Sequence, residues 1–305
     1  MRPVPTVPLA LVTQFLRLTR ANRTYVTAEG ARRRVHASEL RPEKYGPPAR
    51  LRSDVAVTVR HDHPWPVYTV TPTTRTARGS VVYLHGGGWV GEIVVQHWQL
   101  AAQIAAEAGT TVTVPIYPLV PFGNAREAAE GVTALVLSNE DRYGDTCLAG
   151  DSAGGQIALS AALELLHRHG MVVPRTELIA PALDLTWSNP RIPVVQPTDP
   201  WLGTPGGRVL AEYWRGDLDI LDPLVSPLMG DPTGLGPISV FTGTRDVLNP
   251  DAHLLAAKAA EAGVSLDFHE QVGQLHNYPL LPTKVGASAR KVIVADLHHA
   301  IWKVG

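Results

Sequence analysis

The alternation of short apolar runs with helical patterns most constrains how this 305-residue chain can fold. Most of the later runs are rich in β-branched residues and almost continuously hydrophobic, as expected for strands buried on both faces of a parallel sheet. Three of the helical patterns between them end at Gly109, Gly170 or Gly263, since glycine relieves the left-handed backbone of a helix C-terminus. The sequence therefore predicts a βαβ progression and an open, mostly parallel α/β sheet of eight strands. The predicted strands are 55–59, 67–70, 81–84, 111–117, 146–149, 178–182, 238–241 and 266–269, and the predicted helices are 96–108, 125–137, 153–169, 251–262 and 283–301.

Two segments do not follow this alternation. Residues 1–50 contain one amphipathic helical pattern, which includes Leu9, Val12 and Leu16, and then a stretch rich in arginine and proline. The other segment, about 187–218, has three tryptophans among prolines and glycines. Insertions that leave a sheet at its carboxyl edge commonly cover a site there, so we interpret both segments as parts of a lid. Residues 1–50 would form an N-terminal cap region, and 51–305 a main domain that carries the cap insertion.

Composition excludes several classes of protein. The formal net charge of −1 gives no electrostatic argument for binding nucleic acid or an anionic membrane. The single cysteine cannot form an intramolecular disulfide. No run approaches the roughly 20 apolar residues of a membrane span. The apolar stretch 7–12 after Arg2 faintly resembles a signal sequence, but Gln14 and Arg17 interrupt the pattern. We expect a cytoplasmic protein without a membrane span.

The segment 150–155, Gly-Asp-Ser-Ala-Gly-Gly, joins a predicted strand to a predicted helix. A serine on such a sharp turn needs small residues two positions before and after it, and Gly150 and Gly154 meet this need. The helix N-terminus then directs its free N–H groups at developing negative charge. This context predicts that Ser152 is a nucleophile. The alternative is a glycine-rich turn that holds a phosphate, but no phosphate-binding lysine follows it.

A second glycine-rich loop, His85 to Trp89, follows the predicted strand 81–84. Three successive glycines let backbone N–H groups turn inward, and loops of this type supply oxyanion-hole donors in lipases and esterases. We predict that Gly87 and Gly88 donate such N–H groups and that Ala153 donates a third. Losing one donor of this kind typically costs ~3–4 kcal/mol of transition-state stabilisation. His85 is expected to organise the loop, and the alternative for the whole run is a flexible glycine turn.

A nucleophilic serine needs a base that is held by an acid, in the chain order Ser, Asp or Glu, His. Asp246 follows the predicted strand 238–241, and His276 follows the last predicted strand. Both lie beyond carboxyl ends of strands, which places them at the same edge of the sheet as Ser152. The sequence predicts Asp246 as the orienting acid and His276 as the general base.

Other titratable residues have simpler interpretations. Asp251, the rival acid, begins the next predicted helix and is expected to be its N-cap. Cys147 is expected to be a core thiol. The histidines show no tight ligand spacing, so we expect no metal. The remaining histidines considered are expected to be structural (269), on helices away from the site (167, 169, 253) or on the surface (61, 63).

Seven segments between residues 80 and 285 together resemble the hormone-sensitive-lipase-like esterases of the α/β-hydrolase superfamily. They are His-Gly-Gly-Gly-Trp (85–89), Tyr-Pro-Leu (117–119), Gly-Asp-Ser-Ala-Gly-Gly (150–155), Pro-Ala-Leu-Asp-Leu-Thr (181–186), Asp-Pro-Leu-Val-Ser-Pro (222–227), Gly-Thr-Arg-Asp (243–246) and His-Asn-Tyr-Pro (276–279). The resemblance implies an α/β-hydrolase fold whose cap is built from N-terminal helices and an insertion after the sixth strand. The chain departs from the family at Phe122, where an acidic residue is frequent, and at Gln156, where asparagine is common.

The resemblance also implies a reaction, the hydrolysis of small or short-to-medium acyl esters, or of lactones, through an acyl-enzyme and without a cofactor. A ligand receptor on the same fold is disfavoured because such relatives lack the histidine that is present here as His276. A peptidase or an acyltransferase with the same triad stays open. Trp89, Trp187, Trp201 and Trp214 would line an apolar pocket or belong to the core. The apolar last strand leaves a homodimer open.

Overall fold

All eight predicted strands form one sheet in the computed structural model, which describes residues 6–41, 43–61 and 64–302. The strand order across the sheet is β1-β2-β4-β3-β5-β6-β7-β8. The first two strands join by antiparallel pairing, β1 with β2 and β2 with β4, and all other neighbours are parallel. The strands are β1 (Val55–Arg60), β2 (Val67–Pro72), β3 (Ser80–Leu84), β4 (Thr111–Pro115), β5 (Thr146–Asp151), β6 (Thr176–Ile179), β7 (Ile238–Gly243) and β8 (Leu266–Gln271).

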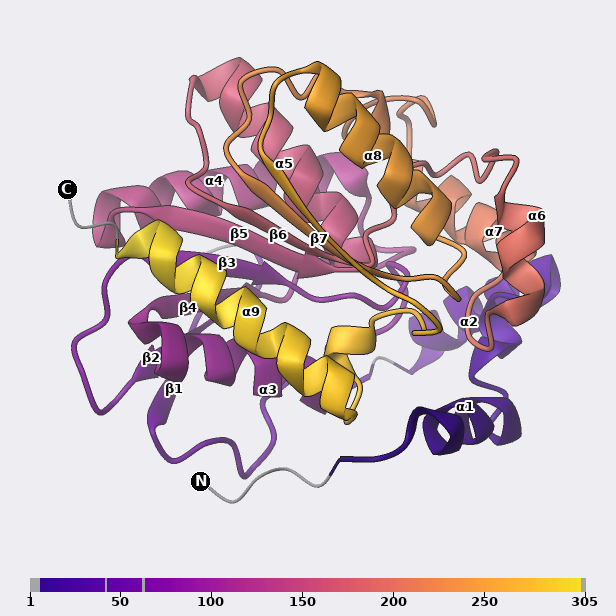
Figure 1. The fold of residues 1–305 in the computed structure, drawn as a ribbon, viewed down its shortest axis with the longest axis horizontal. Helices are drawn as coiled ribbons and strands as arrows, with labels where there is room; N and C mark the ends of the chain where they lie inside the picture. Colours follow the sequence, from indigo (N-terminus) through magenta and orange to yellow (C-terminus); the bar gives the residue numbers. More distant parts are fainter. Residues whose placement is uncertain (1–5, 42, 62–63, 303–305) are drawn as a thin grey trace.

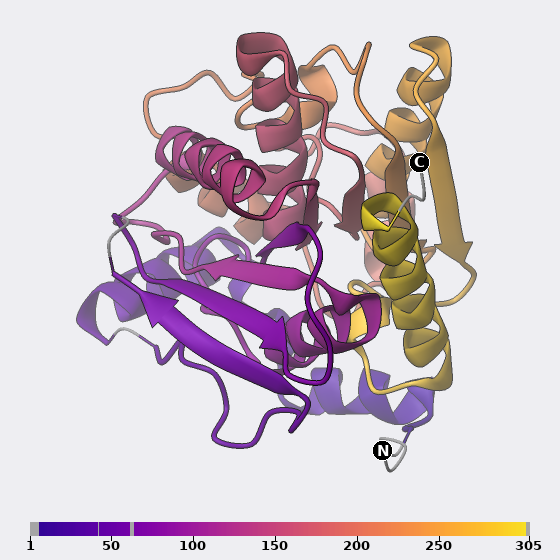
Figure 2. The same cartoon turned by 90° about the vertical axis from the view of Figure 1, so that its left-hand side faces the viewer.

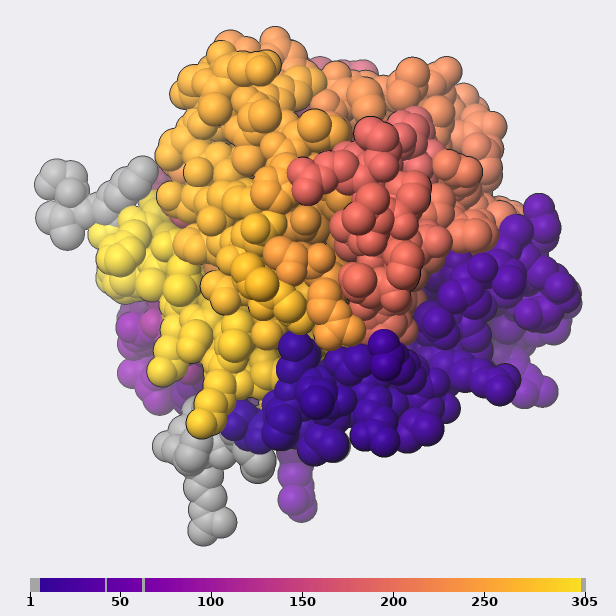
Figure 3. All heavy atoms as spheres, turned by 45° about the vertical axis from the view of Figure 1, so that its right-hand side comes forward, coloured from indigo at the N-terminus to yellow at the C-terminus, as the bar shows by residue number. Residues whose placement is uncertain are grey.

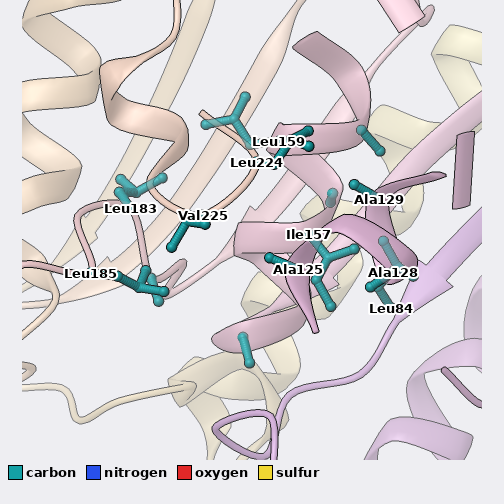
Figure 4. Packing of buried hydrophobic residues seen from close by; sticks show 14 of the residues in the cluster. Leu84, Ala125, Ala128, Ala129, Ile157, Leu159, Leu183, Leu185, Leu224 and Val225 are labelled. Atoms are coloured by element: carbon teal, nitrogen blue, oxygen red, sulfur yellow. The ribbon is translucent and has the colours of Figure 1, made fainter. Parts of the chain in front are cut away.

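Helices cover both faces of the sheet (Figures 1 and 2). One face carries α4 (Ala125–Tyr143), α5 (Ala153–His169) and α8 (Asn249–Glu261), and the other carries α3 (Val95–Gln103) and α9 (Lys284–Ile301). Figure 4 shows part of the first core layer, in which Leu84 of β3, Ala128 of α4 and Ile157 of α5 pack together. Strands β3 to β7 are buried along their whole length, which explains their continuous hydrophobicity.

Three helices differ from their predicted bounds. Helix α4 runs to Tyr143, six residues beyond its predicted end at 137. The predicted helix 96–108 is α3, which ends at Gln103 and continues as a π-helical segment, Ile104–Gly109. Helix α8 begins at Asn249, two residues before the predicted start, and its N-cap is Leu248. No described helix has both the length and the apolar character needed to cross a membrane.

The first 50 residues contain two helices, α1 (Leu9–Leu18) and α2 (Ala28–Leu40), separated by a short 3₁₀ turn at Ala21–Thr24. Only α1 was predicted. The N-cap of helix α2 is Thr27, whose hydroxyl accepts a hydrogen bond from the Gly30 N–H at 3.0 Å. Its sequence has no clear hydrophobic period because the helix buries only Gly30, Ala31 and Val35.

The segment 187–218 contains α6 (Ile192–Val195), a 3₁₀ turn (Gln196–Thr198) and α7 (Thr204–Arg215). It lies against the N-terminal segment, as the red and indigo surfaces of Figure 3 show. The N–H of Gly206 in α7 donates to the Tyr25 carbonyl at 2.8 Å. A Cβ atom at Gly206 would lie 2.3 Å from the Thr24 carbonyl oxygen, so the contact requires glycine. Two segments whose contacting residues are 181 positions apart in the chain therefore pack as neighbours. Two further 3₁₀ turns occur at Pro227–Met229 and Tyr278–Leu280.

Candidate active site

Ser152 occupies a strained turn between the central strand β5 and helix α5. Its backbone has φ 54° and ψ −116°, a conformation that L-residues rarely adopt. Both flanking glycines are required by close backbone approach. A Cβ at Gly150 would lie 2.3 Å from the Gly154 carbonyl oxygen, and one at Gly154 would lie 2.0 Å from the Leu84 carbonyl oxygen. The turn therefore holds Ser152 at the carboxyl edge of the sheet, at the N-terminus of α5.

The structure brings the three predicted triad residues together. His276 Nε2 lies 3.0 Å from Ser152 Oγ, and His276 Nδ1 lies 2.8 Å from Asp246 Oδ2. Ser152, His276 and Asp246 are 8%, 3% and 0% exposed, so bulk water does not compete strongly for these contacts. The three side chains have the mutual geometry that a nucleophile, a base and an orienting acid need for acyl transfer.

The loops that carry Asp246 and His276 are joined by their backbones. The Arg245 N–H donates to the Gln274 carbonyl at 3.0 Å. A Cβ at Gly243 would lie 2.4 Å from the same carbonyl oxygen, so glycine at the end of β7 allows this approach. The other carboxylate oxygen of Asp246 accepts from the Leu248 N–H at 2.9 Å. These contacts therefore hold the Asp246 carboxylate in place independently of its contact with His276.

The surroundings of His276 favour its charged form. Burial by itself lowers the pKa of His276, but the charges of Asp246, Asp199 and Asp151 and the hydrogen bond that the ring donates to Asp246 outweigh it, so the pKa is raised. The indole of Trp201 stands edge-on to the imidazole, with ring centroids 5.6 Å apart. An imidazolium formed in this site is therefore stabilised.

The loop after β3 has the backbone expected of an oxyanion hole. Gly87 and Gly88 have φ values of 132° and 60°, and a Cβ at Gly87 would lie 2.2 Å from the Gly91 carbonyl oxygen. Within the described chain, the N–H groups of Gly87, Gly88 and Ala153 form no hydrogen bond to another residue. Gly87, Gly88 and Ser152 line the same pocket. The three predicted donors remain available to a ligand.

Asp151, next to Ser152, joins several segments to the turn between β5 and α5. Its carboxylate accepts from Tyr83 Oη at 2.7 Å, from the Gly86 N–H at 3.0 Å and from Asn277 Nδ2 at 2.8 Å. His97 Nε2 lies 3.3 Å away. Burial alone would raise the pKa of Asp151, but the charge and hydrogen bond of His97, together with the hydrogen bond from Tyr83, outweigh it and the pKa is lowered. A permanent buried anion thus holds the glycine loop and the histidine loop in place.

Asp199, in the segment 187–218, is not among the site residues that the sequence predicts. Its carboxylate accepts from the N–H groups of Trp201 and Leu202, and across the chain from the Val247 N–H at 3.0 Å. Burial, and then the charge of Asp246, raise the pKa of Asp199 to about 6. The only local sequence signal at this position is the Asp-Pro pair 199–200. Nothing in the sequence indicates that Asp199 contacts the loop that carries Asp246.

The rival residues lie elsewhere, and one expectation about them is wrong. Asp251 is not a helix N-cap, because α8 starts at Asn249; its carboxylate is 1% exposed and accepts from Asn189 Nδ2 at 2.7 Å. Burial raises the pKa of Asp251 to about 7. His269 stacks on the Phe241 ring within the sheet, and His253 Nε2 lies 2.7 Å from a Glu270 oxygen.

The other residues in question are structural or exposed. His85 stacks on Tyr117, and burial lowers its pKa to about 4, so the ring is neutral. Cys147 is fully buried, and burial raises the pKa of its thiol far above the usual range. His61, His167 and His169 are exposed, and residue 63 lies outside the described residues.

Only one of the four tryptophans considered, Trp201, lines the pocket with Ser152. Trp89 and Trp214 are core residues whose indole N–H groups both donate to Gln156 Oε1, at 3.1 and 2.8 Å. The Gln156 amide nitrogen donates to the Leu224 carbonyl at 2.7 Å. At position 156 the family commonly has asparagine. The longer glutamine side chain reaches both indole N–H groups and the Leu224 carbonyl, which explains this departure.

The pocket above Ser152 has a volume of about 750 Å³, which falls in the range of small-molecule sites. Both unusual segments contribute to its wall, through α1, Tyr25, Trp201 and Leu202. Most of the wall is apolar, and Arg34, Glu43 and Glu92 form a polar part of it. Burial, and then the charge of Glu43, raise the pKa of Glu92 to about 7. Among the residues described, no group of three or more His, Cys, Asp or Glu side chains is arranged to hold a metal ion.

Comparison with known proteins places this site in a family. A sequence model of the α/β-hydrolase fold matches residues 81–280, about two thirds of the chain. The chain belongs to the α/β-hydrolase family. A triacylglycerol lipase of Mycobacterium tuberculosis is 31% identical to this α/β hydrolase over 255 residues, which cover 80% of this chain and 53% of the lipase. An acetyl-hydrolase of Streptomyces hygroscopicus is 32% identical over 221 residues, which cover 70% of this chain and 73% of the relative.

Solved structures agree on the fold of the α/β hydrolase. An esterase from the bacterial hormone-sensitive lipase family superposes with a TM-score of 0.80 at 24% identity, covering 96% of this chain and 98% of the other. The hormone-sensitive-lipase homologue EstE7, from a metagenome library, gives a TM-score of 0.82 at 21% identity, covering 97% and 100%. The resemblance drawn from the sequence is confirmed, and the chain is a member of a family of carboxylic ester hydrolases. It spans about half the length of the M. tuberculosis lipase.

Proposed function

We propose that this α/β hydrolase is a serine carboxylesterase with Ser152, His276 and Asp246 as its triad. The observation that carries the proposal is the continuous set of contacts from Asp246 through His276 to Ser152, at 2.8 and 3.0 Å, on the floor of a mostly apolar pocket. The names of its relatives, which include lipase, acetyl-hydrolase and esterase, support ester substrates. A pocket of about 750 Å³ suits small or short-to-medium acyl esters, or lactones.

The mechanism follows from the geometry. His276 Nε2 takes the Ser152 hydroxyl proton while Asp246 holds the other ring nitrogen as its N–H donor. The alkoxide attacks the ester carbonyl, and the oxyanion is stabilised by the N–H groups of Gly87, Gly88 and Ala153. The alcohol leaves with the proton from His276, and water, activated by the same imidazole, releases the acid from the acyl-enzyme. No step requires a cofactor.

The cap is part of the same proposal. Residues 1–50 and about 187–218 both contribute to the pocket wall, so we assign them to the selection of the acyl or alcohol group. We also propose a cytoplasmic location and a homodimer. The free edge of the sheet at β8 is the surface that a dimer would use, and sedimentation equilibrium measures that state.

The test combines labelling and turnover. Wild type should react with a fluorophosphonate probe and cleave p-nitrophenyl acetate, butyrate or octanoate, while Ser152→Ala should lose labelling and at least about 10³-fold of its activity. Ser138→Ala, at an exposed serine of α4, is the matched control and should behave as wild type. An active Ser152→Ala enzyme would refute the nucleophile. Amide turnover without ester turnover would favour a peptidase, and acyl transfer to an added alcohol in preference to water would favour an acyltransferase.

A further inference from the structure

Helix α1 presents an apolar stripe to solvent. Leu11, Phe15 and Leu18 are 54%, 64% and 76% exposed. Their spacing of four and three residues places them on one face of the helix. The helix packs inward through a different face, which buries Thr13 and Leu16. The outer stripe is therefore not required to hold α1 in place.

The cap region is also strongly basic. The first 50 residues contain nine arginines and one lysine against three glutamates, a formal charge of +7, so the other 255 residues carry −8. The net charge of −1 conceals this separation. The three glutamates already have partners, because Glu29 pairs with Arg33, Glu43 with Arg34 and Glu39 with His36.

Three exposed cations of this region lie at or just after the end of α1. Arg17 lies in the last turn of the helix, and Arg20 and Arg23 follow it. All three are exposed, and none makes an ion pair within the described ranges 6–41, 43–61 and 64–302. We call these three arginines, with Leu11, Phe15 and Leu18, the α1 patch.

The α1 patch lies at the entrance to the active-site pocket. Leu11 and Phe15 belong to the pocket wall as well as to the exposed stripe. Figure 3 shows the indigo N-terminal segment on the surface beside the cap insertion. A surface that bound the α1 patch would therefore lie over the opening that leads to Ser152.

We propose that the α1 patch docks this protein on anionic lipid bilayers. The apolar stripe would enter the boundary between headgroups and acyl chains, and the arginines would contact the lipid phosphates. Docking would bring the pocket entrance to the bilayer, so an ester dissolved there could enter without crossing bulk water. The proposal concerns binding and does not depend on the triad.

The positive charge and the exposed apolar side chains of the α1 patch together favour an anionic bilayer over other binding partners. A second copy docked through the same patch would bring two strongly basic segments together, which like-charge repulsion opposes. Nucleic acid would satisfy the arginines, but its backbone contacts leave three large apolar side chains without a partner. An anionic bilayer satisfies both kinds of side chain.

The test is co-sedimentation of the full chain with lipid vesicles. Wild type should bind vesicles of equal parts phosphatidylcholine and phosphatidylglycerol and not vesicles of phosphatidylcholine alone. Raising NaCl from about 50 to about 500 mM should weaken this binding at least about tenfold, because salt screens the arginines. Both Leu18→Ser and the triple variant R17E/R20E/R23E should reduce binding about tenfold or more. None of these positions lines the pocket, so hydrolysis of dissolved p-nitrophenyl acetate should be unchanged.

Matched controls lie at the far end of α5. Val172→Ser and Arg168→Glu change an exposed apolar residue and an exposed cation there, and they should bind vesicles as wild type does. Circular dichroism melting shows whether each variant folds. Equal binding to both kinds of vesicle, no binding, or binding unaffected by charge reversal would overturn the proposal. Tighter binding of duplex DNA than of vesicles, or a dimer that Leu18→Ser dissociates, would assign the patch to another partner.

Discussion

Asp199 joins the cap insertion to the acid of the triad through a single carboxylate. One of its oxygens accepts from the Trp201 and Leu202 N–H groups of its own loop, and the other accepts from the Val247 N–H, next to Asp246. Its charge also raises the pKa of His276. The cap insertion therefore influences the base electrostatically, and not only by shaping the pocket.

This coupling predicts a shift in the pH profile. His276 must be neutral to accept the Ser152 proton, and its pKa is raised, so kcat/KM should rise with pH through a midpoint above about 6.5. Asp199→Asn removes a negative charge, so the midpoint should move to lower pH. The variant also leaves the Val247 N–H without its acceptor, which should cost about 1–3 kcal/mol of unfolding free energy.

The control for this profile is Asp217→Asn, at an exposed acid far from the triad, which should leave the midpoint unchanged. A midpoint that rises in Asp199→Asn, or stays where it is, would show that the Asp199 charge does not act on His276.

A second buried acid, Asp251, predicts how stability depends on pH. Its pKa is about 7 in the folded protein and about 4 in an unfolded chain. An acid with a raised pKa stabilises the fold fully below the unfolded pKa, and this contribution is lost as pH rises towards 7. Asp251→Asn cannot ionise and still accepts from Asn189, so it should be more stable than wild type at pH 8, by at most about 4 kcal/mol, with no gain at pH 4.

Urea unfolding at both pH values measures this difference. Asp141→Asn, at an exposed position of α4, should show none, because its carboxylate stays in water. A gain of equal size at pH 4 and pH 8 would rule out titration of Asp251 as the cause.

At the scale of elements, the contact between α7 and the N-terminal segment depends on one glycine. A Cβ at Gly206 would lie 2.3 Å from the Thr24 carbonyl oxygen and 2.5 Å from the Tyr25 Cα, both of them backbone atoms. Tyr25 lines the pocket, and its hydroxyl lies beside Gly88. The two segments cannot accept a methyl group there without moving apart.

Gly206→Ala should therefore disturb the pocket more than the triad. We expect KM for p-nitrophenyl butyrate to rise severalfold with a smaller change in kcat, and the unfolding free energy to fall by about 1–3 kcal/mol. Gly46→Ala is the matched control in the same region, because its nearest neighbour would be the Tyr68 hydroxyl at 3.8 Å. Unchanged KM and stability in Gly206→Ala would contradict this account of the contact.

The strands were predictable from the sequence, and the second cap helix was not. Continuous apolar runs mark strands β3 to β7 because helices cover both of their faces. Helix α2 buries one small face against α7 and so has no strong hydrophobic period. The start of α8 was misplaced because a leucine occupies the N-cap position, where no capping side chain marks it.

At the scale of the whole molecule, the serine turn, the chain order and the rule that sites gather at the carboxyl ends of parallel strands predict Ser152, Asp246 and His276, and the fold brings these three side chains into contact. The same rule says nothing about Asp199, whose role depends on a contact with a distant loop. The charge separation between residues 1–50 and the rest of the chain can be counted in the sequence, but the net charge hides it because a net charge is a sum over the whole chain. Contacts between distant segments, unlike motifs, become visible only in the folded chain.

The whole-molecule prediction concerns loss of activity. Asp151 holds side chains or backbone from β3, the glycine loop, α3 and the histidine loop, and all of these lie in or on the core of the sheet. Local loosening of the site would therefore break buried hydrogen bonds of the core. We expect the urea midpoint for loss of esterase activity to coincide with that for loss of near-ultraviolet circular dichroism. Inactivation at clearly lower urea would show that the site loosens first.

If the two midpoints coincide, the buried Asp151 has a practical consequence. A coloured ester then reports the native fraction of the protein, since a molecule that turns over substrate has its core intact. Libraries of variants could be ranked for thermal tolerance from residual turnover after heating, on crude samples and without purification. For the same reason, substitutions selected only for faster turnover should leave the Asp151 carboxylate and its four partners unchanged.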